Sequence, residues 1–585
     1  MSSKRKALVA ATAAVALGLT AACGNTGGSN SSNGGAKNAQ NAALTEVLNV
    51  SDKKGGTLEL WSSQDVDSLD PARGYYAFVW NLNRLYTRTL LSYDAKPGAD
   101  GMKLVPDLAT AEAVLSNDGK TYTYTLRDGL KFDDGTPITS KDIKYGIERI
   151  FAQDVVSGGP VYLIEQLDQG QKYPGPYKDS DPNKLGLKSV QTPDDKTIVF
   201  NLAQPYADFP YLLAMPGAGP VPAARDTGAQ YGTKPASSGP YKIESYEPGK
   251  AIKWVRNEHW DQATDPLRKA LPDAINMTIT TNADDMDQRL IAGTADVDAA
   301  QTGVQAAART KILQDETLKA NSDTPTTGFI RYAAMSTSVA PFDNVDCRKA
   351  VMLASDPTSL QTARGGPIAG GDIGVNMLPP NIPGAEPDYD PYNRKQGKPQ
   401  VDAAKQALAA CGQPNGFSTT IAVRNNKPAE VKTAEALQAA LKAVNIDAKI
   451  DQIDGAQASS ITGSPTVVKQ KGYGLIISGW AADYPSGAGY LQPLVDSRYI
   501  LQNGNFNFAE IKDPSIDALF DQAKTLPPDQ AAAVYTQINH KVMEGAYILP
   551  FVVDKALNYR NPRLTNVYIH QFWGMYDFQA LGVSS

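Results

Sequence analysis

Histidine and cysteine are scarce in this chain of 585 residues, which has three of each. His259, His540 and His570 are far apart in the sequence, so a histidine-based metal site is not expected. No segment has the spacing of a serine-hydrolase elbow, a zinc-protease helix, a phosphate-binding loop or a dinucleotide-binding loop. No metal ion or cofactor is therefore expected, and a secreted hydrolase is the least favoured class of function.

Apolar runs long enough to cross a bilayer are missing as well. The one shorter run spans residues 7–20; it follows the basic residues Lys4, Arg5 and Lys6, and small residues then lead to Cys23. These flanks are typical of a signal peptide, and the segment resembles a bacterial lipoprotein signal, whose cysteine is diacylated. We expect residues 1–22 to be removed and Cys23 to anchor the protein to the outer face of the cytoplasmic membrane, with plain secretion as the alternative.

Positive charge is in deficit. The formal net charge is -6, and removal of the three basic residues of the signal segment lowers it to -9. Such an acidic chain is not expected to bind nucleic acid. The mature chain keeps Cys347 and Cys411, and an extracytoplasmic compartment permits disulfides. We expect these two cysteines to pair, with two buried free thiols as the alternative.

The length predicts two or three domains. Residues 23–56 are rich in Gly, Ser, Asn and Ala and indicate a flexible tether. Residues 57–61 alternate in polarity, which predicts a first strand. The sequence Asn-Asp-Gly at 117–119 predicts a hairpin turn, and Thr139 with Asp142 predicts the capped start of a helix.

A strand–helix–strand pattern begins near residue 417. Residues 419–423 and 446–450 predict two strands, and an apolar face from Val431 to Val444 predicts the helix between them. This arrangement requires a parallel pair with a right-handed crossover. Residues 475–477 predict a further buried strand of the same sheet. Ligands of such sheets lie at the carboxyl ends of the strands.

The carboxyl end of that last strand carries two large rings and an acid, in Trp480, Asp483 and Tyr484. A buried ammonium group is costly unless an anion meets it, so Asp483 beside these rings is a candidate partner for a cationic group. The residues alone also fit a simpler interpretation, in which Asp483 caps a turn and Trp480 belongs to the core.

Several short motifs resemble those of the family 5 extracellular solute-binding proteins, the oligopeptide, dipeptide and nickel binders of bacterial ABC importers. The motifs follow one another in the family's order and cover most of the mature chain. They lie at residues 105–151, 238–241, 255–260, 290–296, 347–356 and 479–483.

The resemblance implies an α/β fold of the periplasmic-binding-protein type, cluster C and class II, with two lobes and an additional small domain. Lobe I would comprise residues 57–95, 235–325 and 553–585. The small domain would comprise residues 96–234, and lobe II residues 326–552.

The resemblance also implies a function. The protein would be a lipid-anchored monomer without catalytic activity that closes its lobes on a peptide and delivers it to an ABC permease with a cytoplasmic ATPase. An oligosaccharide or a metal chelate is the alternative ligand.

Site residues follow from the same resemblance. Backbone groups of Gly479 and Ala481 would bind the peptide and Asp483 its ammonium group, while Trp480 and Tyr484 would line side-chain pockets or belong to the core. The loop after the first strand would face the ligand from the other lobe, and two tyrosines are further candidates. These additional residues are Ser62, Ser63, Gln64, Tyr75 and Tyr76.

Overall fold

The computed structural model describes residues 39–182, 185–455 and 457–584, which belong to one compact unit. The signal segment, Cys23 and the first part of the tether lie outside these ranges, so their assignments stay predictions. Within the described ranges, none of the helices combines the length and the apolar character needed to span a bilayer.

A five-stranded sheet contains the first predicted strand. Its order is β11-β1-β10-β9-β8, with β1 parallel to both of its neighbours. Strand β1 alternates between buried and partly exposed side chains, as the sequence predicted, because one face of the sheet packs on an apolar core. The strands are β1 (Thr57–Ser62), β8 (Tyr241–Glu247), β9 (Ala251–Arg256), β10 (Ala274–Ile279) and β11 (Val297–Asp298).

A six-stranded sheet contains the predicted strand–helix–strand unit. Its order is β14-β18-β13-β17-β15-β16, and β15 runs parallel to β16, as predicted, and also to β17. Asn445 ends the intervening helix with a φ of 62°, a left-handed conformation that asparagine tolerates. The strands are β13 (Thr326–Met335), β14 (Asp372–Ile373), β15 (Ser418–Arg424), β16 (Asp447–Ile453), β17 (Tyr473–Trp480) and β18 (Ile548–Lys555).

A smaller, four-stranded antiparallel sheet contains the predicted hairpin. Asn117, Asp118 and Gly119 all have positive φ, which these residue types allow, and they join β4 to β5. The predicted capping box is also present, since the Asp142 carboxylate accepts the backbone N–H of Thr139 at 2.8 Å. The strands are β4 (Val114–Ser116), β5 (Thr121–Thr125), β6 (Val190–Gln191) and β7 (Thr197–Asn201).

Short antiparallel pairs complete the strands. They are β2 (Leu91–Tyr93) with β3 (Leu104–Pro106), β12 (Ser322–Asp323) with β19 (Asn558–Tyr559), β20 (Leu564–Thr565) with β23 (Gly582–Val583), and β21 (Ile569–His570) with β22 (Met575–Tyr576).

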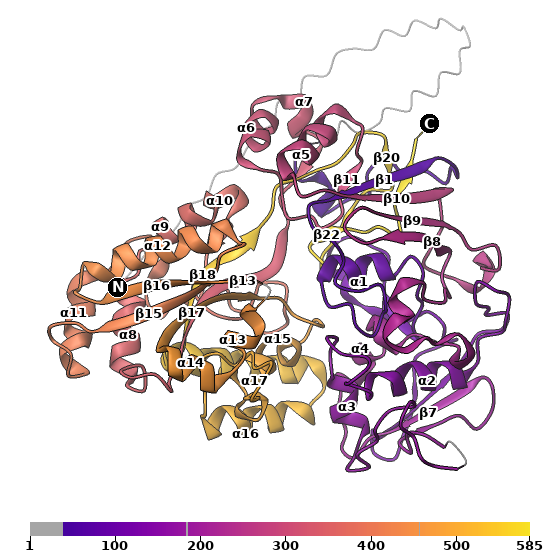
Figure 1. The fold of residues 1–585 in the computed structure, drawn as a ribbon, viewed down its shortest axis with the longest axis horizontal. Helices are drawn as coiled ribbons and strands as arrows, with labels where there is room; N and C mark the ends of the chain where they lie inside the picture. Colours follow the sequence, from indigo (N-terminus) through magenta and orange to yellow (C-terminus); the bar gives the residue numbers. More distant parts are fainter. Residues whose placement is uncertain (1–38, 183–184, 456, 585) are drawn as a thin grey trace, which may run out of the picture. The chain divides into compact units, whose positions relative to one another are not determined.

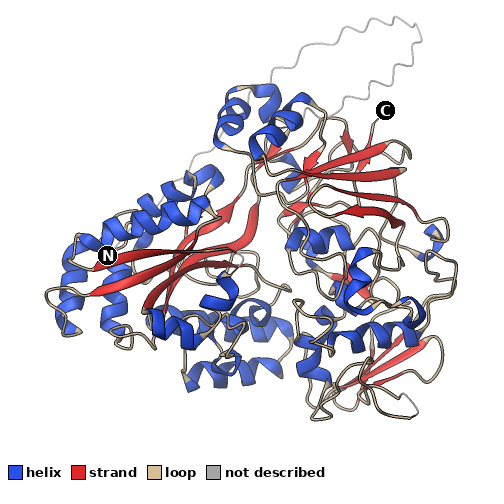
Figure 2. Ribbon diagram, in the orientation of Figure 1, coloured by secondary structure: helices blue, strands red, loops and turns tan. Residues whose placement is uncertain are grey.

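Helices cover both faces of the six-stranded sheet (Figures 1 and 2). Helices α9 and α12 lie along one face, and α14 packs against β17. The helices before this sheet are α1 (Ala77–Asn83), α2 (Ser140–Ile150), α3 (Tyr162–Leu167), α4 (Phe209–Leu212), α5 (Ala283–Ala292), α6 (Ala306–Gln314) and α7 (Glu316–Lys319). Those that follow the start of β13 are α8 (Val345–Ala354), α9 (Pro357–Arg364), α10 (Gly366–Ala369), α11 (Val401–Ala410), α12 (Pro428–Lys442), α13 (Ala458–Thr462), α14 (Pro465–Lys471), α15 (Gly487–Val495), α16 (Pro514–Lys524) and α17 (Pro528–Glu544).

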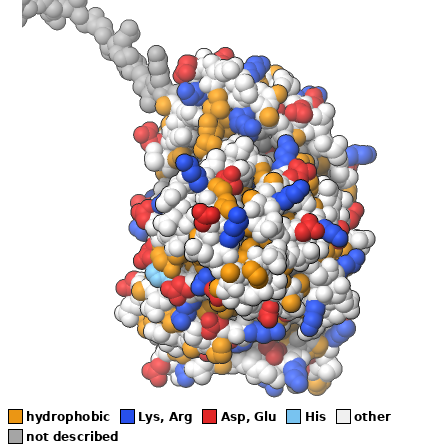
Figure 3. All heavy atoms as spheres, turned by 90° about the vertical axis from the view of Figure 1, so that its left-hand side faces the viewer, with side chains coloured by type: hydrophobic (Ala, Val, Ile, Leu, Met, Phe, Trp, Pro, Cys, Tyr) orange, Lys and Arg blue, Asp and Glu red, His pale blue; other side chains and the backbone are white. Residues whose placement is uncertain are grey.

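Cys347, on α8, is joined to Cys411, which directly follows α11, by a disulfide with a Cα–Cα distance of 5.4 Å. On the face drawn in Figure 3, acidic and basic side chains are interspersed rather than gathered into a field of one sign.

The three larger sheets can be compared with the predicted division of the chain. The four-stranded sheet lies within residues 96–234, and the six-stranded sheet extends three residues beyond the predicted end of lobe II at residue 552, to Lys555. The apolar core of the six-stranded sheet continues without a break into that of the four-stranded sheet, whereas the five-stranded sheet has a core of its own. The domain boundaries themselves stay a prediction.

Candidate functional site

Strand β17 has an open edge at its carboxyl end. On one side it pairs with β13 as far as Trp480, which lies opposite Ile330. On the other side its pairing with β15 ends where Ala422 meets Ile476. Among the described residues, the backbone of 477–480 therefore has no strand partner on the β15 side. Such an edge is available to an added extended chain.

Asp483 lies three residues beyond Trp480, the last residue of β17, and is 8% exposed. Its Oδ2 accepts hydrogen bonds from the hydroxyl groups of Tyr75 at 2.8 Å and Tyr162 at 2.5 Å. Within the described residues its Oδ1 accepts no hydrogen bond. The sequence predicted Tyr75 as a site residue, and the structure brings it to Asp483 across 408 positions of the chain.

The surroundings of this carboxylate contain no compensating cation. None of the lysines, arginines or histidines of the described ranges lies within 4.0 Å of it. Burial raises the pKa of Asp483 to about 6, although the two tyrosine hydrogen bonds lower it in part. Burial and then the charge of Asp483 raise the pKa of Tyr75 and of Tyr162, so both hydroxyls stay protonated and act as donors.

A second buried acid, Asp208, contacts the same loop after β17. Ser486 donates to Oδ2 of Asp208 at 2.6 Å, and burial raises the pKa of Asp208 to about 6. The hydroxyls of Tyr206 and Tyr484 are 2.8 Å apart. We call these contacts the tyrosine–carboxylate interface, which joins Tyr75, Tyr162, Tyr206 and Asp208 to Asp483, Tyr484 and Ser486.

The two predicted aromatic residues after β17 have different environments. Tyr484 is fully buried and stacks on Tyr211 with ring centroids 5.8 Å apart, so it belongs to the core. Trp480 is half-buried against Phe506, at 4.8 Å between ring centroids, and its buried indole N–H lacks a hydrogen-bond partner among the described residues.

Gly479 and Ala481 are both partly exposed. A Cβ on Gly479 would lie 2.7 Å from Cδ of Arg331, so a larger residue at this position would require the arginine side chain to shift. The backbone of Gly479 belongs to the open edge, and its main-chain contact to a ligand stays a prediction.

The loop after β1 contributes less than expected. Ser62 is fully buried and its hydroxyl donates to the carbonyl of Gln64 at 2.6 Å, so its side chain closes a turn instead of facing a ligand. Ser63 and Gln64 are partly exposed. Tyr76 is 49% exposed and stacks on Phe78.

Sequence reasoning missed Tyr162, Tyr206 and Asp208, which complete the interface around Asp483. All three lie in a segment rich in proline, glycine and tyrosine that was assigned only to the small domain. The high tyrosine content was the one available signal, because no local motif marks these residues.

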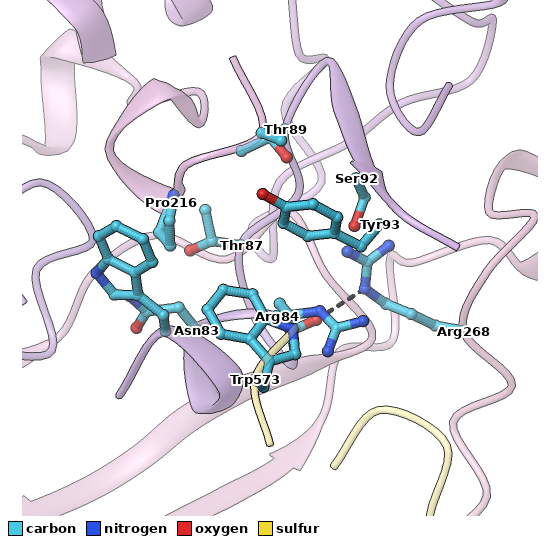
Figure 4. Close-up of a pocket in the computed structure, with 11 residues that line it drawn as sticks. Asn83, Arg84, Thr87, Thr89, Ser92, Tyr93, Pro216, Arg268 and Trp573 are labelled. Carbon is cyan, nitrogen blue, oxygen red and sulfur yellow. Dashed lines mark hydrogen bonds between the residues drawn. The ribbon is translucent and has the colours of Figure 1, made fainter. Parts of the chain in front are cut away.

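A pocket elsewhere in the described structure is lined by Arg84, Arg268 and Trp573 (Figure 4). Both arginines are already paired there, Arg84 with Asp577 at 3.0 Å and Arg268 with Asp107 at 2.9 Å. Arg268 also donates to the carbonyl of Arg84 at 2.7 Å. The charges of this pocket are therefore satisfied within the protein. The described residues also contain no group of three or more His, Cys, Asp or Glu side chains that could hold a metal ion.

Comparisons with known proteins agree with this architecture. A solved structure titled clavulanic acid biosynthesis oligopeptide binding protein 2 is 44% identical, with a TM-score of 0.90, and the match covers 94% of this chain and 99% of that one. The DppA protein of Helicobacter pylori, solved with the peptide STSA, has a TM-score of 0.71 at 21% identity over 91% of this chain and 99% of its own, which shows the periplasmic-binding-protein fold.

Sequence comparison finds the glutathione-binding protein GsiB of Salmonella paratyphi A, 26% identical over 518 residues, which are 88% of this chain and 90% of that protein. The profile of the bacterial extracellular solute-binding proteins, family 5 Middle, matches residues 103–501. This is a family of transport binding proteins and not of enzymes. The order of the motifs, the α/β fold and these matches agree: the chain belongs to the bacterial extracellular solute-binding proteins of family 5.

Proposed function

We propose that the protein binds short peptides outside the cytoplasmic membrane and delivers them to an ABC permease that is driven by a cytoplasmic ATPase. The observation that carries this proposal is the Asp483 carboxylate. It is buried, it has no cationic partner among the described residues, and its Oδ1 is free to accept. A protonated peptide amine supplies the missing charge and donates to that oxygen.

The open edge of β17 supports a peptide over other ammonium compounds. Backbone groups of 477–480 can pair with the main chain of an extended ligand, which reads no side-chain sequence. The half-buried ring of Trp480 lies at the end of this edge and offers an apolar surface to a ligand side chain. The names of the relatives, which bind oligopeptides and glutathione, are consistent with this ligand class.

Closure follows from the same contacts. Tyr75 and Tyr162 come from the chain before the six-stranded sheet, and Asp483 comes from the loop that follows β17 of that sheet. A peptide that contacts both sides stabilises the closed arrangement through the contacts that it makes only there.

Calorimetry with trialanine and N-acetyl-trialanine tests the proposal. Trialanine should bind, and acetylation should weaken binding by about 100-fold, because it removes the charge that Asp483 compensates. Equal affinity for both peptides would refute the role of Asp483. Binding of maltotriose without binding of peptides would favour an oligosaccharide ligand, and cleavage of the peptide would favour a hydrolase.

The proposal places the protein on the membrane through a lipid on Cys23. Replacing Cys23 by Ala should move the protein from the membrane fraction to the culture medium, because a single residue carries the anchor. Immunoblots of the two fractions measure this shift. If the variant stays in the membrane fraction, attachment depends on some other part of the chain.

A further inference from the structure

The described part of the chain passes between the residues assigned to lobe I and those assigned to lobe II at two places, which lie side by side. In the first crossover, β12 is followed by Thr324, Pro325 and then β13. In the second, β18 is followed by Ala556, Leu557 and then β19. Because β12 pairs with β19, and β13 with β18, the two crossovers form one narrow ribbon, whose strands β13 and β18 are labelled in Figure 1.

The ribbon is irregular where it leaves the six-stranded sheet. The pairing of β13 with β18 shifts register between Thr326 and Ile330, and Gly328 lies within this bulge with a φ of 77°. A bulge interrupts the ladder of hydrogen bonds, and the residues that join β12 to β13 and β18 to β19 belong to no strand. Bending of one lobe against the other is therefore expected at residues 324–330 and 555–557, which we call the hinge.

A segment near the N-terminus is bonded to the lobe I end of this ribbon. The backbone N–H of Asn41 donates to the carbonyl of Ser322 at 3.0 Å, and its side-chain Oδ1 accepts the N–H of Thr324 at 2.7 Å. The N–H of Ala43 donates to Oδ1 of Asp323 at 3.1 Å. Three consecutive residues of the first crossover are therefore bonded to the same segment.

The same segment is also fastened to the body of lobe I. The backbones of Leu48 and Val567 exchange two hydrogen bonds, at 2.8 Å and 3.0 Å, and the side chain of Asn49 donates to the carbonyl of Leu564 at 2.9 Å. Leu48 is buried in the apolar core of the five-stranded sheet. We call residues 41–49 the N-terminal brace.

Asp323 connects the N-terminal brace to both crossovers. Its Oδ1 accepts from Ala43, and its Oδ2 accepts from the guanidinium group of Arg560, which follows β19, and from the hydroxyl of Tyr576 at 2.8 Å. The side chain of Asp323 is fully buried, so these bonds are shielded from water. A displacement of the brace would therefore act on both crossovers through one carboxylate.

We propose that the N-terminal brace fixes the lobe I end of the crossovers and confines bending to the hinge. The brace lowers the entropic cost of closure, because a ligand does not have to order the crossovers as the lobes come together. The chain that leads from the predicted lipid anchor at Cys23 continues into this brace, so membrane attachment and bending involve neighbouring residues. This inference goes beyond the proposed function, since the hinge can be braced whatever ligand the lobes enclose.

Two asparagines of the brace provide a matched pair for a test. Both are exposed and have positive φ, 67° for Asn41 and 51° for Asn49, so glycine keeps the backbone conformation at either position. Asn41→Gly removes the bond to Thr324 at the hinge, whereas Asn49→Gly removes the bond to Leu564 in lobe I. Asn41→Asp keeps an acceptor for Thr324 and should behave as the wild-type protein.

Hydrogen exchange of the ligand-free proteins, followed by mass spectrometry, measures the mobility of the hinge. Thr324 itself loses its acceptor in Asn41→Gly, so the informative amides are those of residues 326–330 and 555–557. Within the described structure, the hydrogen bonds of these amides do not involve Asn41. Their exchange should be about tenfold faster in Asn41→Gly than in the wild type, and unchanged in Asn49→Gly.

Calorimetry with trialanine measures the consequence for closure. Asn41→Gly should bind trialanine about 3- to 10-fold more weakly, because closure must then order a looser hinge, and Asn49→Gly should keep the wild-type affinity. Equal hinge exchange in the two glycine variants, or a wild-type affinity in Asn41→Gly, overturns the inference and leaves the proposed function in place. An Asn41→Asp variant that matches Asn41→Gly also overturns it. If trialanine does not bind the wild-type protein, the proposed function fails, and the exchange rates alone decide the inference.

Discussion

Replacing Asp483 by Asn should weaken the binding of trialanine by about 100-fold and leave the affinity for N-acetyl-trialanine unchanged. The amide of Asn is close to isosteric with the carboxylate and can accept the hydroxyls of Tyr75 and Tyr162 in the same way. The change therefore removes the charge and keeps the packing. Calorimetry on the two proteins with the two peptides gives the coupling between the carboxylate and the amine directly.

Stability of the ligand-free variant provides an independent check. The pKa of Asp483 is raised to about 6, so its ionised form destabilises the folded protein at pH 7. Each pKa unit corresponds to about 1.4 kcal/mol, so Asp483→Asn should be more stable than the wild type by about 1–3 kcal/mol. A variant that is both less stable and unable to bind either peptide would point to damaged packing instead of a lost charge pair.

Asp208→Asn is the matched control. Asp208 belongs to the same tyrosine–carboxylate interface and is also buried, but it accepts its hydrogen bond from Ser486, whereas Tyr75 and Tyr162 donate to Asp483. This variant should gain stability at pH 7 and keep the difference in affinity between the free and the acetylated peptide. If Asp208→Asn also loses that difference, the peptide amine does not bind specifically to Asp483.

The scaffold was predictable because its signals are local. The turn at Asn117–Gly119 needs residues that tolerate positive φ, and the start of α2 needs a carboxylate within reach of the Thr139 N–H. The crossover between β15 and β16 depends on the apolar period of α12 and on Asn445 at its end. Each signal involves residues a few positions apart, so the sequence alone contains it.

Part of the candidate site could be expected from the sequence, because Asp483 follows a predicted strand and also lies in a family motif. Gly479 and Asp483 follow from the resemblance to the family, and the structure adds what the residues alone left open, namely that Asp483 is buried and that Tyr484 is core. Tyr162 lies 321 positions from Asp483, and no periodicity or spacing connects such residues.

The affinity for trialanine should fall as the pH is lowered through 6. The ligand-free protein protonates Asp483 at a pKa of about 6, whereas the complex needs the ionised form, so binding at low pH must first remove a proton. Relative to pH 7, the dissociation constant should rise about tenfold at pH 5 and about 100-fold at pH 4. The peptide amine stays charged throughout this range, and the peptide carboxylate stays mostly ionised.

Other titratable groups near Asp483 are expected to contribute differently to the pH dependence of peptide binding. Tyr75 and Tyr162 stay protonated at every pH in the range, because their pKa values are raised. Asp208, at a pKa of about 6, and Glu165, whose pKa is raised by burial, titrate nearby. Asp483→Asn should bind weakly at pH 7 and lose the steep dependence on pH, whereas Asp208→Asn should keep it. A slope that survives in Asp483→Asn assigns the pH dependence to another acid.

Acid unfolding is separable from this effect because the two have opposite signs. A carboxylate whose pKa is raised on folding stabilises the folded protein below its unfolded value of 3.8, and this contribution is lost as the pH rises through about 6. As the pH falls from 7 to 5, the protonation of Asp483 and Asp208 therefore makes the ligand-free protein more stable, not less. A melting temperature that holds or rises over this interval, while the affinity for trialanine falls tenfold, shows that the loss of affinity is not caused by acid unfolding, and Asp483→Asn then tests whether the proton and the peptide amine compete for Asp483.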